Sequence, residues 1–171
     1  LGLLNNVVLH AGIGFKDAGD AVLLLSVSEV EGDVQSLSGS EYLDLVHGLV
    51  VGQPSIDLSL EASVQRVCRQ LIIEGIAKSA HDCSDGGLAV AITESCLVGQ
   101  IGFQGDFAVV GRWDAALFGE SQSRIEVSVS PEDISRLADI CFAEALPWTT
   151  LGHVGGQSVQ FNDFLDIPLT D

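Results

Sequence analysis

The sequence of 171 residues contains no methionine and few basic side chains. Because a complete translation product begins with methionine, we expect the chain to be a fragment of a longer protein. Only seven residues are Lys or Arg against 24 Asp or Glu, which gives a formal net charge of −17. A field of that sign repels phosphate polyanions and anionic lipid surfaces, so we expect no nucleic-acid partner and no membrane partner.

Long apolar runs and secretory signals are also missing. Runs such as Ala21–Leu25 fall far below the roughly 20 residues that a membrane-spanning helix needs. The chain does not begin with a basic segment followed by an apolar core, the pattern of a signal peptide, although a fragment can have lost one. Export is therefore unsupported, and we expect a cytoplasmic protein.

Cysteine is scarce and widely spaced. The four residues, Cys68, Cys83, Cys96 and Cys141, form no C-x-x-C pair and have no nearby His at zinc-ligand spacing. Two of them fall on apolar helix faces. We therefore predict buried free thiols in a reducing compartment rather than a zinc site.

Apolar residues make up 47% of the chain and charged residues only 18%, which is the composition of a folded domain rather than of a disordered acidic tail. The length fits one domain. We divide the chain into an N-terminal arm (1–20), a folded domain (21–161) and a C-terminal tail without helical or strand pattern (162–171).

Hydrophobic periodicity and capping residues predict the elements of this domain. Strands are expected at 21–28, 77–81, 102–110, 124–130, 149–154 and 158–161. Helices are expected behind the caps Ser40, Asp57 or Ser59, Gly86-Gly87, and Ser130, with a turn or short helix at 115–118. The last two strands flank Gly155–Gln157 and predict a hairpin. This order predicts an α+β fold, a mixed α/β sheet with packed helices.

The segment from Ala80 to Leu88 lies between a predicted strand and a predicted helix. Asp82 and Asp85, followed by Gly86 and Gly87, suit a metal and phosphate site, because carboxylates hold Mg²⁺ and glycines let the backbone approach oxygens. A helix start capped by Ser84 or Asp85 explains the same residues. Both interpretations stay open at this stage.

A second polar segment runs from Leu117 to Arg124. Its side chains, Glu120, Ser121, Gln122 and Arg124, offer donors and acceptors to a polar ligand, but a capped turn uses them equally well. Arg66 and Arg69 face away from the apolar side of a helix, as either a solvated face or a substrate clamp. No nucleophile constellation and no complete dinucleotide fingerprint is present.

The sequence also resembles the PurL family, the formylglycinamidine ribonucleotide synthases, over nearly its whole length. The resemblance rests on four motifs in family order: Gly39–Leu43 with His47-Gly48; Pro54, Asp57-Leu58 and Glu61; His81–Ala91 with Glu94; and Leu117–Arg124. The His-Asp-x-Ser-Asp-Gly-Gly form resembles the second of two related copies in that family. Ser38 departs from the pattern, because the family commonly has Gly there.

The resemblance implies a fold like the C-terminal domain of AIR synthase (PurM). It implies a part in converting formylglycinamide ribonucleotide to the amidine, with ATP and glutamine-derived ammonia. Asp82 corresponds to a Mg²⁺ ligand; Asp85, Gly86 and Gly87 correspond to a nucleotide-phosphate loop. Glu120, Ser121 and Gln122 correspond to a substrate-binding segment, and no catalytic residue is carried over.

The implied cofactors are ATP or ADP and Mg²⁺. The implied partners are the N-terminal ATP-binding domains of the same enzyme, the glutaminase subunit PurQ and a PurS-type subunit. We expect the isolated domain to be inactive. Two alternatives remain: a scaffold domain with a vestigial nucleotide site, and a domain of another enzyme of the AIR-synthase superfamily.

Overall fold

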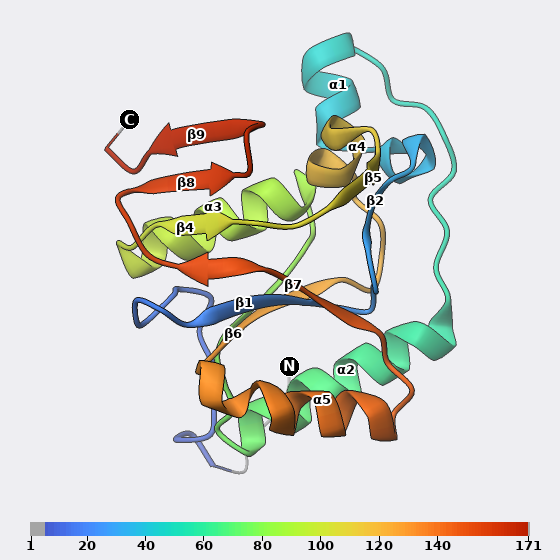
Figure 1. Ribbon diagram of the computed structural model, residues 1–171. Coiled ribbons are helices and arrows are strands. Elements are labelled where there is room, and N and C mark those ends of the chain that lie inside the picture. The colour runs from blue at the N-terminus through green and yellow to red at the C-terminus, as the bar shows by residue number, and fades with distance from the viewer. Residues whose placement is uncertain (1–5, 171) are drawn as a thin grey trace.

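A computed structural model describes residues 6–170 of the chain (Figure 1). These residues contain nine strands: β1 (Ala21–Leu25), β2 (Val30–Gly32), β3 (Ala77–Asp82), β4 (Phe103–Gly105), β5 (Val109–Gly111), β6 (Ile125–Val129), β7 (Trp148–Val154), β8 (Ser158–Phe161) and β9 (Leu165–Pro168). The α-helices are α1 (Glu41–His47), α2 (Leu58–Ile73), α3 (Gly87–Gly99), α4 (Trp113–Phe118) and α5 (Ile134–Ala143). Short 3-10 turns occupy η1 (Val34–Leu37) and η2 (Pro131–Asp133).

Seven of the strands form one mixed sheet in the order β3-β6-β1-β7-β4-β8-β9. Only the β4–β8 pair is parallel, and the other neighbours are antiparallel. The two remaining strands, β2 and β5, pair in parallel as a small second sheet. The predicted α+β class with a mixed sheet is confirmed.

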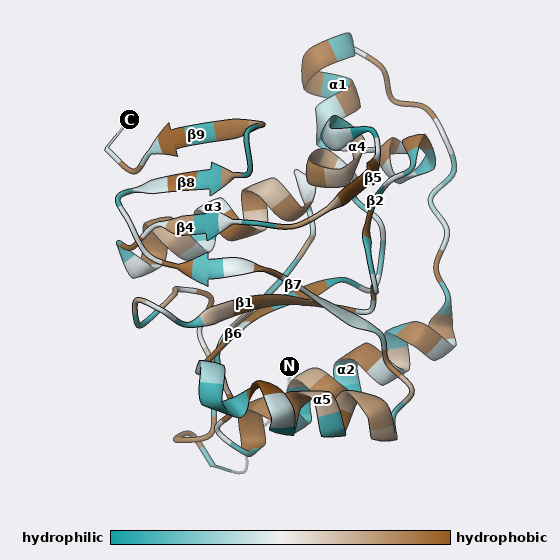
Figure 2. Cartoon of the chain, in the orientation of Figure 1, coloured by the Kyte–Doolittle hydropathy of each residue, from teal (hydrophilic) through white to brown (hydrophobic). Residues whose placement is uncertain are grey.

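Strand β1 runs through the centre of the structure and is buried on both faces. Val22 and Leu24 pack with α3 on one face, whereas Leu23 and Leu25 pack with α2 and α5 on the other. Figure 1 shows α2 and α5 side by side below β1 and β6, and Figure 2 shows that β1 is hydrophobic along its length. Each fully buried leucine contributes about 1.5–3 kcal/mol of transfer free energy. Such burial on both faces explains why this short apolar run forms a strand.

The predicted helix caps are confirmed at two positions. The N–H of Leu43 donates to Ser40 Oγ (3.3 Å), and α1 ends at His47 with Gly48, whose φ is +64°, as its C-cap. Asp57, and not Ser59, caps α2, because its Oδ1 accepts from the N–H groups of Ser59 (2.8 Å) and Leu60 (3.2 Å). These contacts satisfy amides that no carbonyl of the helix can reach.

The predicted hairpin at Gly155–Gln157 is wrong, because β4 lies between β7 and β8. The reason is local: Gly155 donates its N–H to the carbonyl of Gly102 (2.7 Å), and Gly102 donates to the carbonyl of Gly156 (3.1 Å). The glycine turn therefore holds the residue that precedes β4, and β8 pairs with β4 instead of folding back on β7.

Two further differences concern strands. The predicted strand 102–110 is broken into β4 and β5, which belong to different sheets. The tail contains β9, which pairs antiparallel with β8 although its sequence shows no strand pattern. Asn162, at the turn between β8 and β9, exchanges hydrogen bonds with the backbone of Phe107 (3.2 and 2.6 Å) and so fixes both the break and the tail.

All four cysteines are free and buried, as predicted. Burial raises the pKa of the Cys83 thiol to about 12, so it is a neutral thiol at physiological pH. Within residues 6–170, no helix is long and apolar enough to cross a membrane.

Candidate functional site

The two polar segments singled out in the sequence lie side by side. Antiparallel pairing places Asp82, the last residue of β3, opposite Ile125, the first residue of β6. One step further, the N–H of Cys83 donates to the carbonyl of Arg124 (2.9 Å). The loop that joins β3 to α3 therefore lies against the turn that joins α4 to β6.

A cavity of about 330 Å³ lies between these segments. Its lining contains four carboxylates and one guanidinium: Glu61, Asp82, Asp85, Glu120 and Arg124. Glu61 comes from the first turn of α2. Glu61 belongs to the second of the motifs that resemble the PurL family but is not among the predicted site residues, and that motif is its signal in the sequence.

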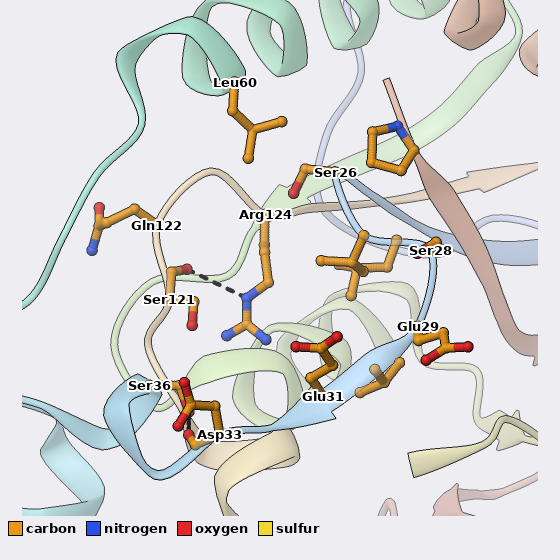
Figure 3. A pocket seen from close by; sticks show the side chains of 14 residues that line it. Ser26, Ser28, Glu29, Glu31, Asp33, Ser36, Leu60, Ser121, Gln122 and Arg124 are labelled. Atoms are coloured by element: carbon orange, nitrogen blue, oxygen red, sulfur yellow. Dashed lines mark hydrogen bonds between the residues drawn. The ribbon is translucent and has the colours of Figure 1, made fainter. Parts of the chain in front are cut away.

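Two neighbouring cavities extend the site. One, of about 450 Å³, is lined by Glu120, Ser121 and Gln122 together with η1 and the loop that precedes α2. The other, of about 350 Å³, is shown in Figure 3, where the side chain of Arg124 reaches in among Ser121, Glu31 and Asp33. Gln122 lines all three cavities. The predicted substrate segment thus lies where the three cavities meet.

Asp82 is exposed at the rim of the first cavity. The hydroxyl of Ser84 donates to its carboxylate, and this hydrogen bond is the main cause that lowers the pKa of Asp82 below its ordinary value. His81 Nδ1 lies 3.5 Å from the same carboxylate. Asp82 is therefore anionic at neutral pH and available to a cation.

The donor set fits a metal that is shared with a ligand rather than enclosed by protein. Among the described residues, no group of three or more His, Cys, Asp or Glu side chains is arranged to hold a metal ion. Mg²⁺ is commonly held by one or two carboxylates together with substrate phosphates and water. Asp82 meets that requirement, with Asp85 and Glu61 lining the same cavity.

The paired glycines are required by contacts within the chain. Gly86 and Gly87 have φ values of +79° and +69°, which favour glycine. A Cβ on Gly87 would lie 2.5 Å from the carbonyl oxygen of Gly119 and 2.9 Å from the carbonyl carbon of Phe118. Because both are backbone atoms, they cannot move aside as a flexible side chain would. Only glycine therefore lets α3 begin against this turn.

Neither Ser84 nor Asp85 caps α3 with its side chain, so the predicted cap is wrong, whereas the glycines do form a tight turn, in which the N–H of Gly87 donates to the carbonyl of Ser84 (3.0 Å). The N-cap is Gly86, and no side chain of its own loop caps this end. Instead, the N–H of Gly86 donates to Oε1 of Glu120 (2.8 Å), and the N–H of Glu41 donates to the same oxygen (2.9 Å). Sequence reasoning missed both contacts, because Glu120 lies 34 residues from Gly86 and 79 from Glu41.

Arg124 fixes the turn that carries Glu120. The residue is buried, with 7% of its surface exposed. Its Nε donates to the carbonyl of Ser121 (3.3 Å), drawn dashed in Figure 3, and its Nη2 donates to the carbonyl of Gly119. A guanidinium that donates to carbonyls on both sides of Glu120 makes the turn rigid.

The arginines of α2 are not part of these cavities. Arg66 is exposed and donates through Nε to Glu144 beside α5 at 2.9 Å. Arg69 is also exposed, and it lines a separate groove between α2 and the N-terminal arm. Both residues are exposed, as the solvated-face interpretation requires.

Comparison with known proteins identifies relatives along nearly the whole chain. The family model described as AIR synthase related protein, C-terminal domain, matches residues 17–162. The phosphoribosylformylglycinamidine synthase subunit PurL of Moorella thermoacetica is 41% identical over 160 residues, which are 93% of this chain and 21% of that protein. PurL of Thermosynechococcus vestitus is 46% identical over 169 residues, which are 94% of this chain and 22% of that protein. The chain thus spans about a fifth of the length of these relatives.

Solved structures show the same fold at lower identity. Thermotoga maritima PurL complexed with FGAR has a TM-score of 0.77 and 18% identity, with 96% of this chain and 29% of that chain covered. HypE of E. coli, a hydrogenase maturation protein, has a TM-score of 0.60 and 15% identity, with 93% of this chain and 52% of that chain covered. From the family match over residues 17–162, the chain belongs to the AIR synthase related proteins, as a C-terminal domain of that family.

Proposed function

We propose that this chain is the C-terminal domain of the second AIR-synthase-like repeat of a PurL subunit. In that subunit it serves the ATP-dependent conversion of formylglycinamide ribonucleotide to formylglycinamidine ribonucleotide. The observation that carries the proposal is the meeting of the Asp82–Gly87 loop with the Glu120–Arg124 turn around one acidic cavity. PurL relatives at 41% and 46% identity support it.

Each predicted site residue has a place in this proposal. Asp82 holds Mg²⁺ together with nucleotide phosphates, and the loop of Asp85, Gly86 and Gly87 faces those phosphates. The Glu120–Gln122 segment forms the substrate side, where Ser121 and Gln122 line the larger neighbouring cavity. Structures of T. maritima PurL complexed with ATP and with ADP support a nucleotide as the ligand.

The partners follow from the same proposal. The N-terminal ATP-binding domains of the subunit supply the catalytic residues. The glutaminase subunit PurQ supplies ammonia, a PurS-type subunit completes the enzyme, and the assembly acts in the cytoplasm. A PurLQS structure is known from Thermotoga maritima. Exposed apolar side chains on α1, on the segment that follows it and at the start of α2 support a covering domain, because Leu45, Val50 and Leu58 are 80%, 78% and 73% exposed.

A scaffold domain with a vestigial site is the second candidate. It is favoured by one observation: Gly86 and Gly87 are explained by contacts with Val90 and with the Leu117–Gly119 backbone, without any phosphate. Under this hypothesis the acidic cavity binds nothing, and the domain serves only to bury apolar surface. The two candidates differ in whether removal of the Asp82 charge changes nucleotide binding.

A chimera tests the proposal. The segment of Moorella thermoacetica PurL that matches this chain is replaced by the chain itself, and amidine formation from ATP, ammonia and formylglycinamide ribonucleotide is measured. We expect turnover by the chimera and none by the host lacking the segment. A chimera that assembles normally by gel filtration but forms no product would contradict the proposal.

A further inference from the structure

One carboxylate oxygen joins the starts of two helices. Oε1 of Glu120 accepts from the N–H of Glu41, the first residue of α1, at 2.9 Å and from the N–H of Gly86, the N-cap of α3, at 2.8 Å. The three residues come from segments far apart in the chain. Glu120 therefore adds a direct polar link between two helices that both also pack against α4, where the Tyr42 ring of α1 stacks on Phe118 and Gly87 lies against the Leu117–Gly119 backbone.

The backbone of Glu120 is itself held in place. Its N–H donates to the carbonyl of Ser36 in η1 (2.7 Å). The guanidinium of Arg124 donates to the carbonyls of Gly119 and Ser121, the two residues that flank Glu120. Gly119 also has no room for a side chain, because a Cβ would collide with Ser36 and Ala115. The carboxylate is thus presented from a rigid support.

The charge of Glu120 suits the place where it lies. The first turn of a helix exposes unpaired N–H groups and carries a partial positive charge, so it favours an anion. The remaining first-turn residues of α3, Gly87, Leu88 and Ala89, are buried against α4 and the core. Glu120 supplies a negative charge at this helix start through the N–H of Gly86.

We propose that Glu120 is a positioning residue: its carboxylate fixes the Asp82–Gly87 loop against α1, and so links the acidic cavity to the larger neighbouring cavity. On one side, Gly86 belongs to the loop that presents Asp82 and Asp85 to the acidic cavity. On the other side, Glu41 begins α1, and the segment that follows α1 forms part of the wall of the larger cavity. The inference rests on the proposed function only for what this loop binds.

Hydrogen exchange of backbone amides tests the clamp without any ligand. The exchange of the Gly86 and Glu41 amides is followed by NMR in the wild-type chain and in Glu120→Ala, Glu120→Gln and Glu61→Gln. Hydrogen bonds to charged groups are strong, so we expect Glu120→Ala to speed exchange at both amides by roughly tenfold or more. Glu120→Gln keeps an acceptor oxygen and should restore most of the protection at both.

Two controls separate the clamp from general effects. Glu61→Gln removes a charge from the same cavity without touching either amide, and it should leave both at the wild-type rate. Amides of α5, on the opposite face of the sheet, report whether each variant is folded. Unchanged exchange in Glu120→Ala, or a change at only one of the two amides, would overturn the clamp.

Affinity for Mg·ADP in the full-length subunit tests the positioning role. A positioning residue predicts that Glu120→Ala weakens the affinity and that Glu120→Gln recovers it, because an acceptor oxygen is enough to hold the loop. Equal losses in both variants would assign Glu120 to ligand contact through its charge and would overturn the role. Because the exchange experiment uses no nucleotide, failure of the proposed function leaves its result intact.

Discussion

Alanine at Gly87 tests whether the corner of the site is as tightly packed as the structure shows. Gly75 offers a matched control in the same chain. The φ angles of the two glycines are +69° and +68°, so alanine suffers the same backbone strain at both positions. They differ in surroundings: a Cβ on Gly75 meets no atom within 4 Å, whereas one on Gly87 lies 2.5 Å from the carbonyl oxygen of Gly119.

The expected losses follow from these contacts. Left-handed strain costs about 1–2 kcal/mol, and lower chain entropy in the unfolded state offsets about 0.4–1 kcal/mol of it. Gly75→Ala should therefore lose about 1 kcal/mol of unfolding free energy. At Gly87 the overpacked Cβ adds about 1–3 kcal/mol, for a total of about 2–4 kcal/mol.

Urea unfolding measured side by side reports the difference. With a slope of roughly 2 kcal/mol per molar urea, Gly75→Ala should lower the midpoint by about 0.5 M and Gly87→Ala by about 1–2 M. Equal shifts in the two variants would refute the close approach of α3 to the Gly119 carbonyl.

Three further predictions concern buried polar groups and thiols. Burial raises the pKa of Glu126 from 4.5 to about 8, so the folded chain keeps a proton that the unfolded chain releases, and the free energy of unfolding falls as the pH rises from about 4.5 to about 8. Glu126→Gln should therefore gain in urea midpoint over the wild type between pH 5 and pH 8, and parallel profiles would contradict this. Lys78→Ala leaves the buried carboxylate of Asp20 without its partner at 2.7 Å and should cost about 3–5 kcal/mol in thermal or urea unfolding. Asp17, whose side chain is 65% exposed, pairs with the same lysine, and Asp17→Asn should change stability by at most about 1 kcal/mol. Equal losses in Lys78→Ala and Asp17→Asn would disprove the difference between the buried and the exposed carboxylate. All four cysteines are buried, with the pKa of Cys83 at about 12, so DTNB at pH 8 should label none of them before unfolding and all four after it; rapid labelling of the folded chain would contradict their burial.

Local signals in the sequence predicted local structure well. Ser40 and Asp57 cap the helices that they precede, and the short apolar run at Ala21–Leu25 forms the central strand. Each of these features depends on residues within about four positions, where side-chain type and backbone geometry are directly linked.

Contacts between distant segments were not predictable in the same way. The placement of β4 between β7 and β8 depends on Gly102 fitting into the turn at Gly155 and Gly156, which no periodicity reports. Two strands separated by a short glycine turn normally pair with each other, so the sequence favoured the hairpin.

The site shows the same division. Its two segments were found by their residue types, and β3–β6 pairing brings them together. What the sequence did not reveal is that the carboxylate of Glu120 meets the amide of Gly86 and that Glu61 joins the lining from α2. These contacts come from tertiary packing, which local patterns do not encode.

Calorimetric titration of Mg·ADP into the full-length subunit, as wild type, Asp82→Asn and Asp139→Asn, tests the central claim most directly. Asp82→Asn removes a cavity carboxylate while keeping its size, whereas Asp139 is exposed on α5 across the sheet and serves as a charge-matched control. The account predicts that the nucleotide bound at this repeat is lost in Asp82→Asn and retained in Asp139→Asn. Unchanged affinity and stoichiometry in Asp82→Asn would contradict the account and favour a scaffold domain.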